Sequence, residues 1–226
     1  MKINPHMFRG YDLRGIVDED LNIEIVEHLG KAHGTYMKRH GIDKAIVGYD
    51  CRATSLDYAD ALIRGYSWAG IDTINIGMSL VGIFYWAQHF LKIPGGAFVT
   101  ASHNPAEYNG FKFAIGYSET MVSQQIQALR KMVEDEDYDK ADTVGKMEKQ
   151  NIQQTYFDDV NGKVPLKKSL KVVIDTGNST AGAIAPELLR QAGCEVIESN
   201  CNIDPTFPLG TPDPTENIVA DRKSVV

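Results

Sequence analysis

Apolar positions alternate along the chain between short continuous runs, typical of buried strands, and a three-to-four-residue spacing, typical of helices. The helical spacing is clearest over 22–39, where Gly41 follows as a residue that can end a helix in the left-handed conformation. Ser55 is expected to cap the next helix. The expected helices cover 22–39, 55–70, 80–91, 123–133, 152–160 and 180–191, and the expected strands cover 45–49, 71–76, 96–100, 110–115, 170–175 and 194–197. This alternation predicts an α/β fold.

Two domains are expected, 1–148 and 149–226. A dense acidic run at 134–139 is expected to stay in solvent near the boundary, because its like charges repel one another. The stretch 149–226 contains one strand–helix–strand unit after a helix. The second domain is therefore expected to be an incomplete α/β domain.

Composition and charge exclude several classes of protein. The 226 residues are 43% hydrophobic, which is enough to form a core in each domain. A formal net charge of -7 argues against a nucleic-acid partner, which requires clustered Lys and Arg. No apolar run reaches the roughly 18 residues of a membrane span, and the first residues lack the apolar region of a signal peptide. We therefore expect a cytoplasmic protein with no membrane partner. The three cysteines show no CxxC spacing and predict neither a disulfide framework nor a zinc site.

The most informative stretch is a polar turn that follows an apolar run. Residues 98–105 read FVTASHNP and deliver Ser102 and His103 onto a turn closed by Pro105, and Lys112 follows ten residues after the serine. A serine hydroxyl is a poor nucleophile unless a base takes its proton and cations hold the charge. The GxSxG elbow of hydrolases does not surround this serine, and the GxxxxGK loop of nucleotide-binding proteins is absent from the sequence. On local chemistry alone, a nucleophile site and a plain polar turn both stay open.

This turn also resembles a known motif. Residues 100–105 are similar to the phosphoserine loop of the alpha-D-phosphohexomutases, the family of phosphoglucomutase and phosphomannomutase. The other stretches that agree with the family are 8–15, 47–52, 109–112, 172–178, 205–208 and 212–214. The likeness covers almost the whole chain. It implies a mixed sheet layered between helices in the first domain, followed by an incomplete second α/β domain of similar type.

The resemblance implies a phosphoryl carrier. Ser102 would be held as a phosphoserine that gives its phosphate to a hexose monophosphate, of mannose and/or glucose. The bisphosphorylated sugar would return the other phosphate, so that hexose 1-phosphate and hexose 6-phosphate are interconverted. Lys112 would act through proton transfer or charge stabilisation, and His103 would complete the catalytic group by shaping the loop. Such a reaction rests mainly on positioning and on cations that neutralise the phosphoryl oxygens.

The resemblance further implies that Tyr11 and Arg14 face the substrate and its phosphates, and that Asn104 helps to shape the binding loop. An arginine can hold a phosphate through two hydrogen bonds. A structural alternative stays open, in which Arg14 simply pairs with Asp12 across a turn.

Two other cationic residues have structural alternatives as well. Lys112 alternates with apolar neighbours and could lie on the exposed face of a strand. Arg52 fits an ion pair with Asp50 inside its own loop better than a catalytic role.

The magnesium ion of the family would be held by a phosphoserine oxygen of Ser102 and by aspartates of a DGDxDR loop. The sequence lacks that loop, since Asp204, Asp213 and Asp221 are not clustered in this way, and the loop is expected beyond residue 226. The chain is therefore interpreted as the amino-terminal part of such an enzyme, inactive alone. The complete enzyme would require Mg²⁺ and an activating sugar bisphosphate. Phosphoglucosamine mutase and a non-catalytic phosphosugar-binding module stay open as alternatives.

Overall fold

The computed structural model describes residues 1–213, so Pro214 and Asp221, which the sequence analysis names, lie outside the described residues. The chain divides into two compact units. The first comprises Met1–Asp50, Thr54–Ala101 and Glu107–Gln150, and the second comprises Cys51–Ala53, Ser102–Ala106 and Asn151–Val226. The loop that carries Ser102 is therefore grouped with the second unit, whereas the expected boundary placed it in the first domain, 1–148.

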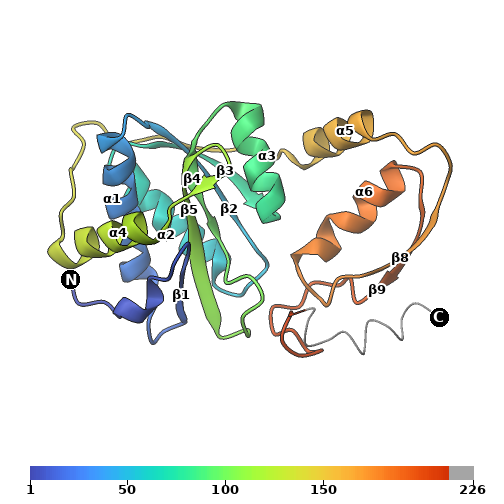
Figure 1. The fold of residues 1–226 in the computed structure, drawn as a ribbon, viewed down its shortest axis with the longest axis horizontal. Helices are drawn as coiled ribbons and strands as arrows, with labels where there is room; N and C mark the ends of the chain where they lie inside the picture. Colours follow the sequence, from blue (N-terminus) through green and yellow to red (C-terminus); the bar gives the residue numbers. More distant parts are fainter. Residues whose placement is uncertain (214–226) are drawn as a thin grey trace. The chain divides into compact units, whose positions relative to one another are not determined.

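A seven-stranded mixed sheet forms the centre of the first unit (Figure 1). Its strands are β1 Leu13–Ile16, β2 Lys44–Tyr49, β3 Asp72–Met78, β4 Gly95–Val99, β5 Tyr108–Gly116, β6 Glu119–Thr120 and β7 Met147–Lys149. Along the order β1-β5-β4-β2-β3-β7, the last four strands run parallel to one another, whereas β5 is antiparallel to both β1 and β4. The short strand β6 pairs with β5. The predicted mixed α/β architecture is confirmed.

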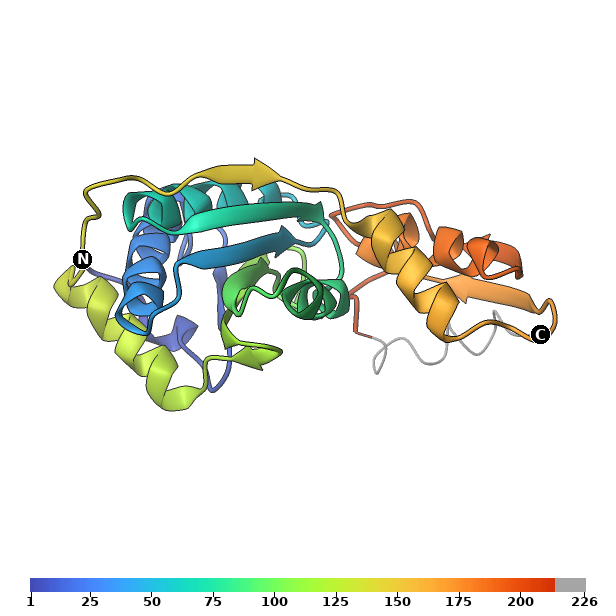
Figure 2. The same ribbon diagram turned by 90° about the horizontal axis from the view of Figure 1, so that it is seen from above.

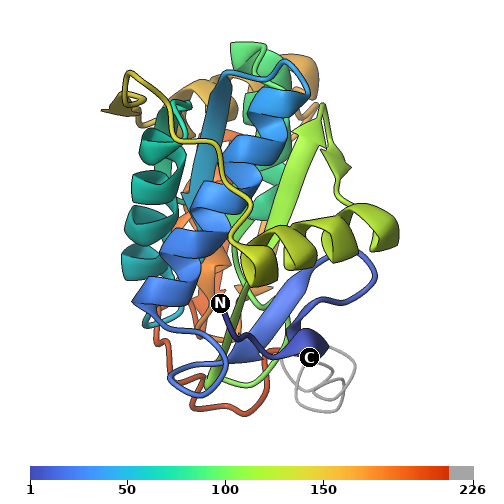
Figure 3. The ribbon, with the colours of Figure 1, turned by 90° about the vertical axis from the view of Figure 1, so that its left-hand side faces the viewer.

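Helices cover both faces of this sheet. They are α1 Ile23–Arg39, α2 Ser55–Trp68, α3 Val81–Leu91 and α4 Ser123–Asp135, and a short 3-10 helix, η1 Pro5–Met7, precedes β1. The helices α1, α2 and α4 lie on one face and α3 lies on the other (Figure 1 and Figure 3). Close approach of α1 and α2 requires glycine, because a Cβ atom on Gly65 would lie 2.6 Å from the Cα atom of Gly30.

The start of α2 differs from the expectation. Ser55 is the first residue of the helix and not its cap, which is Thr54. The Ser55 hydroxyl instead donates a hydrogen bond of 2.6 Å to the carboxylate of Asp50. A short hydroxyl side chain can bond to a neighbouring loop as readily as to a helix end, so the sequence alone did not distinguish the two.

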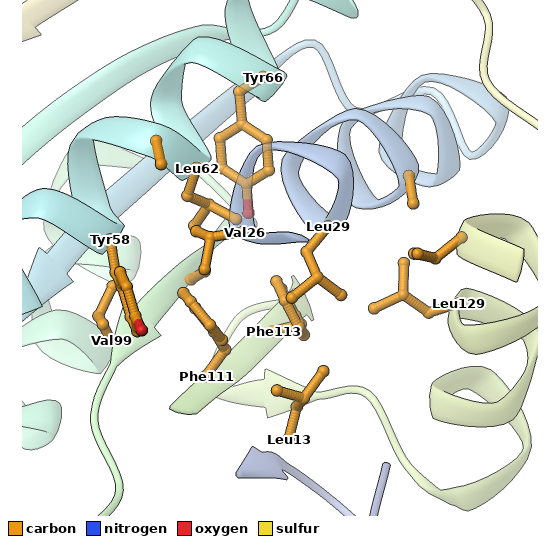
Figure 4. Packing of buried hydrophobic residues seen from close by; sticks show 14 of the residues in the cluster. Leu13, Val26, Leu29, Tyr58, Leu62, Tyr66, Val99, Phe111, Phe113 and Leu129 are labelled. Carbon is orange, nitrogen blue, oxygen red and sulfur yellow. The ribbon is translucent and has the colours of Figure 1, made fainter. Parts of the chain in front are cut away.

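Alternating side chains of β5 place two phenylalanines in the core of the first unit. Phe111 and Phe113 are fully buried and lie against α1 (Figure 4). The residue between them, Lys112, is directed to the opposite face, because successive side chains of a strand alternate. Its cross-strand partner is Phe98 of β4, whose ring lies 5.8 Å from the ring of Phe84 in α3. The core side chains of β5 therefore fix the direction of Lys112.

The segment that follows α4 contacts α1 and the sheet of the first unit. Arg39, the last residue of α1, donates hydrogen bonds of 2.7–2.9 Å to the carboxylates of both Asp137 and Asp139. The strand β7 then pairs in parallel with β3 at the edge of the sheet (Figure 2). The acidic run stays exposed, as expected, but two of its carboxylates are paired with one arginine.

The second unit contains a two-stranded parallel sheet with helices beside it. Its elements are α5 Gln153–Lys163, β8 Lys171–Asp175, η2 Thr180–Ala183, α6 Ala185–Gln191 and β9 Glu195–Ser199. The single helix expected over 180–191 is divided at Ile184, so this expectation is wrong. Pro186 explains the break, because it has no N–H group to continue a helical hydrogen-bond ladder.

A histidine is fully enclosed in the first unit. His33 of α1 is completely buried, with its Nδ1 atom 2.6 Å from the Tyr66 hydroxyl and its ring 4.7 Å from the ring of Phe113. Burial lowers the pKa of His33 from 6.5 to about 3. The folded protein therefore keeps this side chain neutral at a pH where the unfolded chain binds a proton, and the free energy of unfolding decreases as the pH falls below 6.5.

Replacing the buried histidine is expected to weaken this pH dependence. In His33→Gln, the amide can still bond to the Tyr66 hydroxyl but does not titrate. Urea unfolding of both proteins at about pH 7.5 and about pH 5 should show that the wild type loses about 2 kcal/mol more than the variant on acidification. The control His6→Gln replaces an exposed histidine and should follow the wild type. Equal losses in wild type and His33→Gln would contradict the assignment.

Candidate active site

The serine motif begins at the end of β4, where the sequence predicts it. After Val99 ends this strand, the amide of Thr100 donates a 2.9 Å hydrogen bond to the carbonyl oxygen of Gly110 in β5. A side chain at Gly110 is excluded, because its Cβ atom would lie 2.1 Å from the carbonyl oxygen of Leu13 in β1. The motif is thus connected to a strand that is held on both sides.

Within the first unit, Asp12 pairs with the predicted cations. Its Oδ2 atom accepts hydrogen bonds of 2.9 and 2.7 Å from Nε and Nη2 of Arg14, and both side chains are buried. Lys112 Nζ lies 3.8 Å from the same oxygen and 5.1 Å from the centre of the exposed Tyr11 ring. Arg14 thus pairs with Asp12, as the structural alternative had it, and its predicted contact with the substrate stays a prediction. The alternative that Lys112 simply lies on an exposed strand face is wrong, because its side chain is only 19% exposed.

Arg14 also reaches the backbone next to the serine. Its Nη1 atom donates a 3.2 Å hydrogen bond to the carbonyl oxygen of Ala101, the residue that precedes Ser102 in the chain. The ion pair with Asp12 therefore orients the Arg14 guanidinium, which holds the backbone at the residue that leads into the serine loop.

Asn109 is a structural residue of the site that the sequence analysis quoted only as part of a motif. It is completely buried, and its side-chain amide donates hydrogen bonds of 2.9 Å to Thr54 and 3.0 Å to Ser55. Its side-chain oxygen Oδ1 accepts a 2.8 Å hydrogen bond from the backbone amide of Gly110. Asn109 thereby joins the start of α2 to β5.

In the second unit, Ser102 has a left-handed backbone with φ of 57° and an exposed side chain. Its Oγ atom lies 3.2 Å from Nδ1 of His103, and Nε2 of His103 lies 3.8 Å from the carboxylate of Asp213. A residue other than glycine rarely adopts this backbone conformation, and strained positions of this kind cluster at functional sites. An exposed hydroxyl beside an imidazole is suited to proton exchange.

Arg52, for which the sequence favours an ion pair with Asp50 over a catalytic role, contacts this loop. Its Nη1 atom donates a 2.7 Å hydrogen bond to the carbonyl oxygen of Pro105. Its Nη2 atom donates to the carbonyl oxygens of Ser102 at 3.0 Å and Asn104 at 2.6 Å. The sequence showed only that a cation follows a strand end, so its long-range partners could not be read from it.

The predicted site residues thus form two groups. Tyr11, Arg14 and Lys112 lie together around Asp12 in the first unit. Ser102, His103 and Asn104 form a contiguous loop in the second unit.

A magnesium site is not formed by the residues that the structure describes. Between residues 1 and 213, no group of three or more His, Cys, Asp or Glu side chains could hold a metal ion. Magnesium prefers several oxygen ligands, and the exposed hydroxyl of Ser102 supplies one. The metal expected from the sequence therefore stays a prediction, and no step of the chemistry below depends on it. Over the same residues, no helix has the length and apolar character needed to cross a membrane.

Fold and site together define a class of α/β proteins in which polar, cationic loops follow the carboxyl ends of sheet strands, where anionic ligands commonly bind. Comparison with known families is more specific. Residues 5–140 match the model described as "Phosphoglucomutase/phosphomannomutase, alpha/beta/alpha domain I", and residues 154–225 match domain II of the same family. The chain belongs to the phosphoglucomutase/phosphomannomutase family.

Individual relatives agree with this assignment. The chain is 38% identical over 208 residues to the phosphomannomutase/phosphoglucomutase of Pseudomonas aeruginosa, covering 92% of this chain and 44% of the relative. It is 34% identical over 214 residues to the phosphoglucomutase of Neisseria gonorrhoeae, covering 95% and 46%. A solved family protein from Burkholderia thailandensis matches with a TM-score of 0.90 and 31% identity, covering 96% of this chain and 49% of that one. The chain therefore spans about half the length of these relatives.

Removing the shared carboxylate should destabilise the first unit. In Asp12→Asn, the buried Arg14 charge loses its counter-charge, which we expect to lower the free energy of unfolding by about 3 kcal/mol in urea denaturation. Asp139→Asn is the matched control, because it removes a carboxylate from an exposed arginine pair and should cost less than about 1 kcal/mol. Equal costs for the two variants would show that the Asp12 carboxylate is not an essential support.

Proposed function

We propose that this chain takes part in the interconversion of hexose 1-phosphate and hexose 6-phosphate, of mannose and/or glucose, with Ser102 as the phosphoryl carrier. The observation that carries the proposal is the exposed Ser102 hydroxyl on a left-handed residue beside the His103 imidazole. The names of the relatives support the substrate class.

In the proposed step, a hydroxyl of the hexose monophosphate attacks the phosphorus of phosphorylated Ser102. The new bond joins phosphorus to the sugar oxygen, and the bond between phosphorus and Oγ breaks. The sugar hydroxyl loses its proton, and Oγ gains one as the serine is restored. The 3.2 Å separation of Nδ1 from Oγ supports His103 as the group that returns this proton. The second transfer runs in reverse from the other phosphate of the bisphosphorylated sugar.

The remaining site residues are assigned to binding and to charge stabilisation. We assign Lys112 to proton transfer at the sugar or to stabilisation of the phosphoryl oxygens, since its ammonium is held by Asp12 and by the Tyr11 ring. The exposed Tyr11 ring and the Arg14 guanidinium would contact the sugar phosphate. Asn104 would present its side chain to the substrate while Arg52 holds its carbonyl oxygen.

The carrier assignment predicts one phosphate on one serine. After incubation with excess glucose 1,6-bisphosphate and Mg²⁺, the intact mass of the chain should rise by a single phosphoryl group, and peptide mapping should locate it on Ser102. Ser102→Ala should gain none. Ser118→Ala is a matched control that should label as the wild type does, because Ser118 is also exposed and left-handed, with φ of 54°.

A phosphate on another residue, or none on the wild type, would contradict the carrier role. An unlabelled chain that still binds hexose phosphate would favour the non-catalytic binding module, and faster exchange with glucosamine phosphates would favour phosphoglucosamine mutase. We also propose that residues 1–226 alone transfer phosphate without sustained turnover, since the named relatives use about twice this length of chain.

A further inference from the structure

Arg52 connects parts of the second unit that are far apart in the sequence. Its guanidinium bonds to three carbonyl oxygens of the serine loop, and its Cζ atom lies 5.2 Å from the centre of the Phe207 ring. Arg52 is buried, with only 4% of its surface exposed. A buried cation surrounded in this way restrains its acceptors strongly, because hydrogen bonds from charged donors are stronger than neutral ones.

All three acceptors are backbone carbonyl oxygens of the serine loop. The carbonyl oxygens of Ser102, Asn104 and Pro105 all turn toward one planar guanidinium at 2.6–3.0 Å. A loop has no regular ladder of backbone bonds, so its carbonyl groups need other partners. Because one of these groups belongs to Ser102 itself, Arg52 is bonded directly to the backbone of that left-handed residue.

The ring of Phe207 packs against the same guanidinium, and the backbone of Phe207 is itself strained. It has φ of 49°, although bulky residues rarely adopt the left-handed region, and its side chain is buried. Turn hydrogen bonds of 3.0 Å hold it, from its amide to the carbonyl of Asp204 and from the amide of Gly210 to its own carbonyl. Stacking of a cation on a ring stabilises both groups. Two strained residues, Ser102 and Phe207, therefore contact one arginine.

The segment that carries Arg52 is fixed as well. The amide of the preceding residue, Cys51, donates a 2.9 Å hydrogen bond to the hydroxyl of Thr180, which is buried at the start of η2. The backbone from which the guanidinium extends thus has its own anchor.

We propose that Arg52 is a positioning residue that clamps the serine loop and holds Ser102 in the conformation that presents Oγ to a phosphoryl donor. The clamp acts on the backbone and places a fixed positive charge beside the residue that becomes a dianion. Its link to catalysis rests on the proposed function, whereas the clamp itself is a property of the loop.

Two independent readouts test the clamp in Arg52→Met and Arg52→Lys. Hydrogen–deuterium exchange of the peptide covering 100–107 should accelerate by at least about tenfold in Arg52→Met. It should accelerate less in Arg52→Lys, because an ammonium cannot fill the planar three-carbonyl geometry. The rate of phosphoryl uptake on Ser102 from glucose 1,6-bisphosphate should fall by about tenfold or more in both variants. Arg64→Met, which removes an exposed arginine, should leave both readouts unchanged.

A further variant keeps the proposal testable if Arg52→Met does not fold. Phe207→Leu keeps the guanidinium and removes the ring, so it should give smaller changes in the same direction, with circular dichroism showing an intact fold. Unchanged exchange in folded Arg52→Lys and Phe207→Leu would overturn the clamp. Faster exchange with unchanged uptake would overturn the positioning role while leaving the carrier role of Ser102 intact. Absence of uptake by the wild type would overturn the proposed function and with it the catalytic role of Arg52, while the exchange readout still decides the clamp.

Discussion

The antiparallel return of β5 beside β4 is the constraint on which the first unit and its cations depend. Its register pairs Phe98 with Lys112, and on its other edge the same strand pairs Gly110 with Arg14 of β1. Burial of the two phenylalanines that flank Lys112 fixes which face of the sheet this lysine occupies. A slip of one residue would place the lysine in the core against α1 and turn both rings to the opposite face of the sheet. The same apolar packing that stabilises the sheet therefore determines where the charges lie.

The sequence predicts most long elements of the fold, and its failures have physical causes. The helix α1 shows a clear helical spacing and ends near a glycine, whereas the strands β2 and β4 stand out as short continuous runs that are buried. The strand β1 escapes prediction because its four residues include an arginine and a glycine and show no alternation. The strand β7 escapes because all three of its residues are exposed at a sheet edge, so that backbone pairing alone defines it. Short, polar elements carry too little apolar pattern to be recognised before their partners are known.

The candidate site, like the fold, can be predicted from the sequence only in part. Motif resemblance locates the serine loop and Lys112, and the nearby spacing of Asp12 and Arg14 makes their pairing readable from the sequence. Sharing of one carboxylate between Arg14 and Lys112 is not readable, because it depends on the pairing of β1 with β5. The contact of Arg52 with a loop about fifty residues away depends still more on the three-dimensional fold. Chemistry that lies within one motif is thus predictable, whereas the residues that support it are not.

We propose that Ser102 carries a phosphoryl group in a loop whose backbone is held by the buried guanidinium of Arg52. Phosphorus NMR of the phosphorylated chain, titrated with pH, tests this claim most directly. We expect one phosphoserine resonance whose second pKa lies below that of the same chain unfolded in urea, because a neighbouring positive charge favours the dianion. A resonance that titrates identically in the folded and unfolded chains, or that persists in Ser102→Ala, would contradict it.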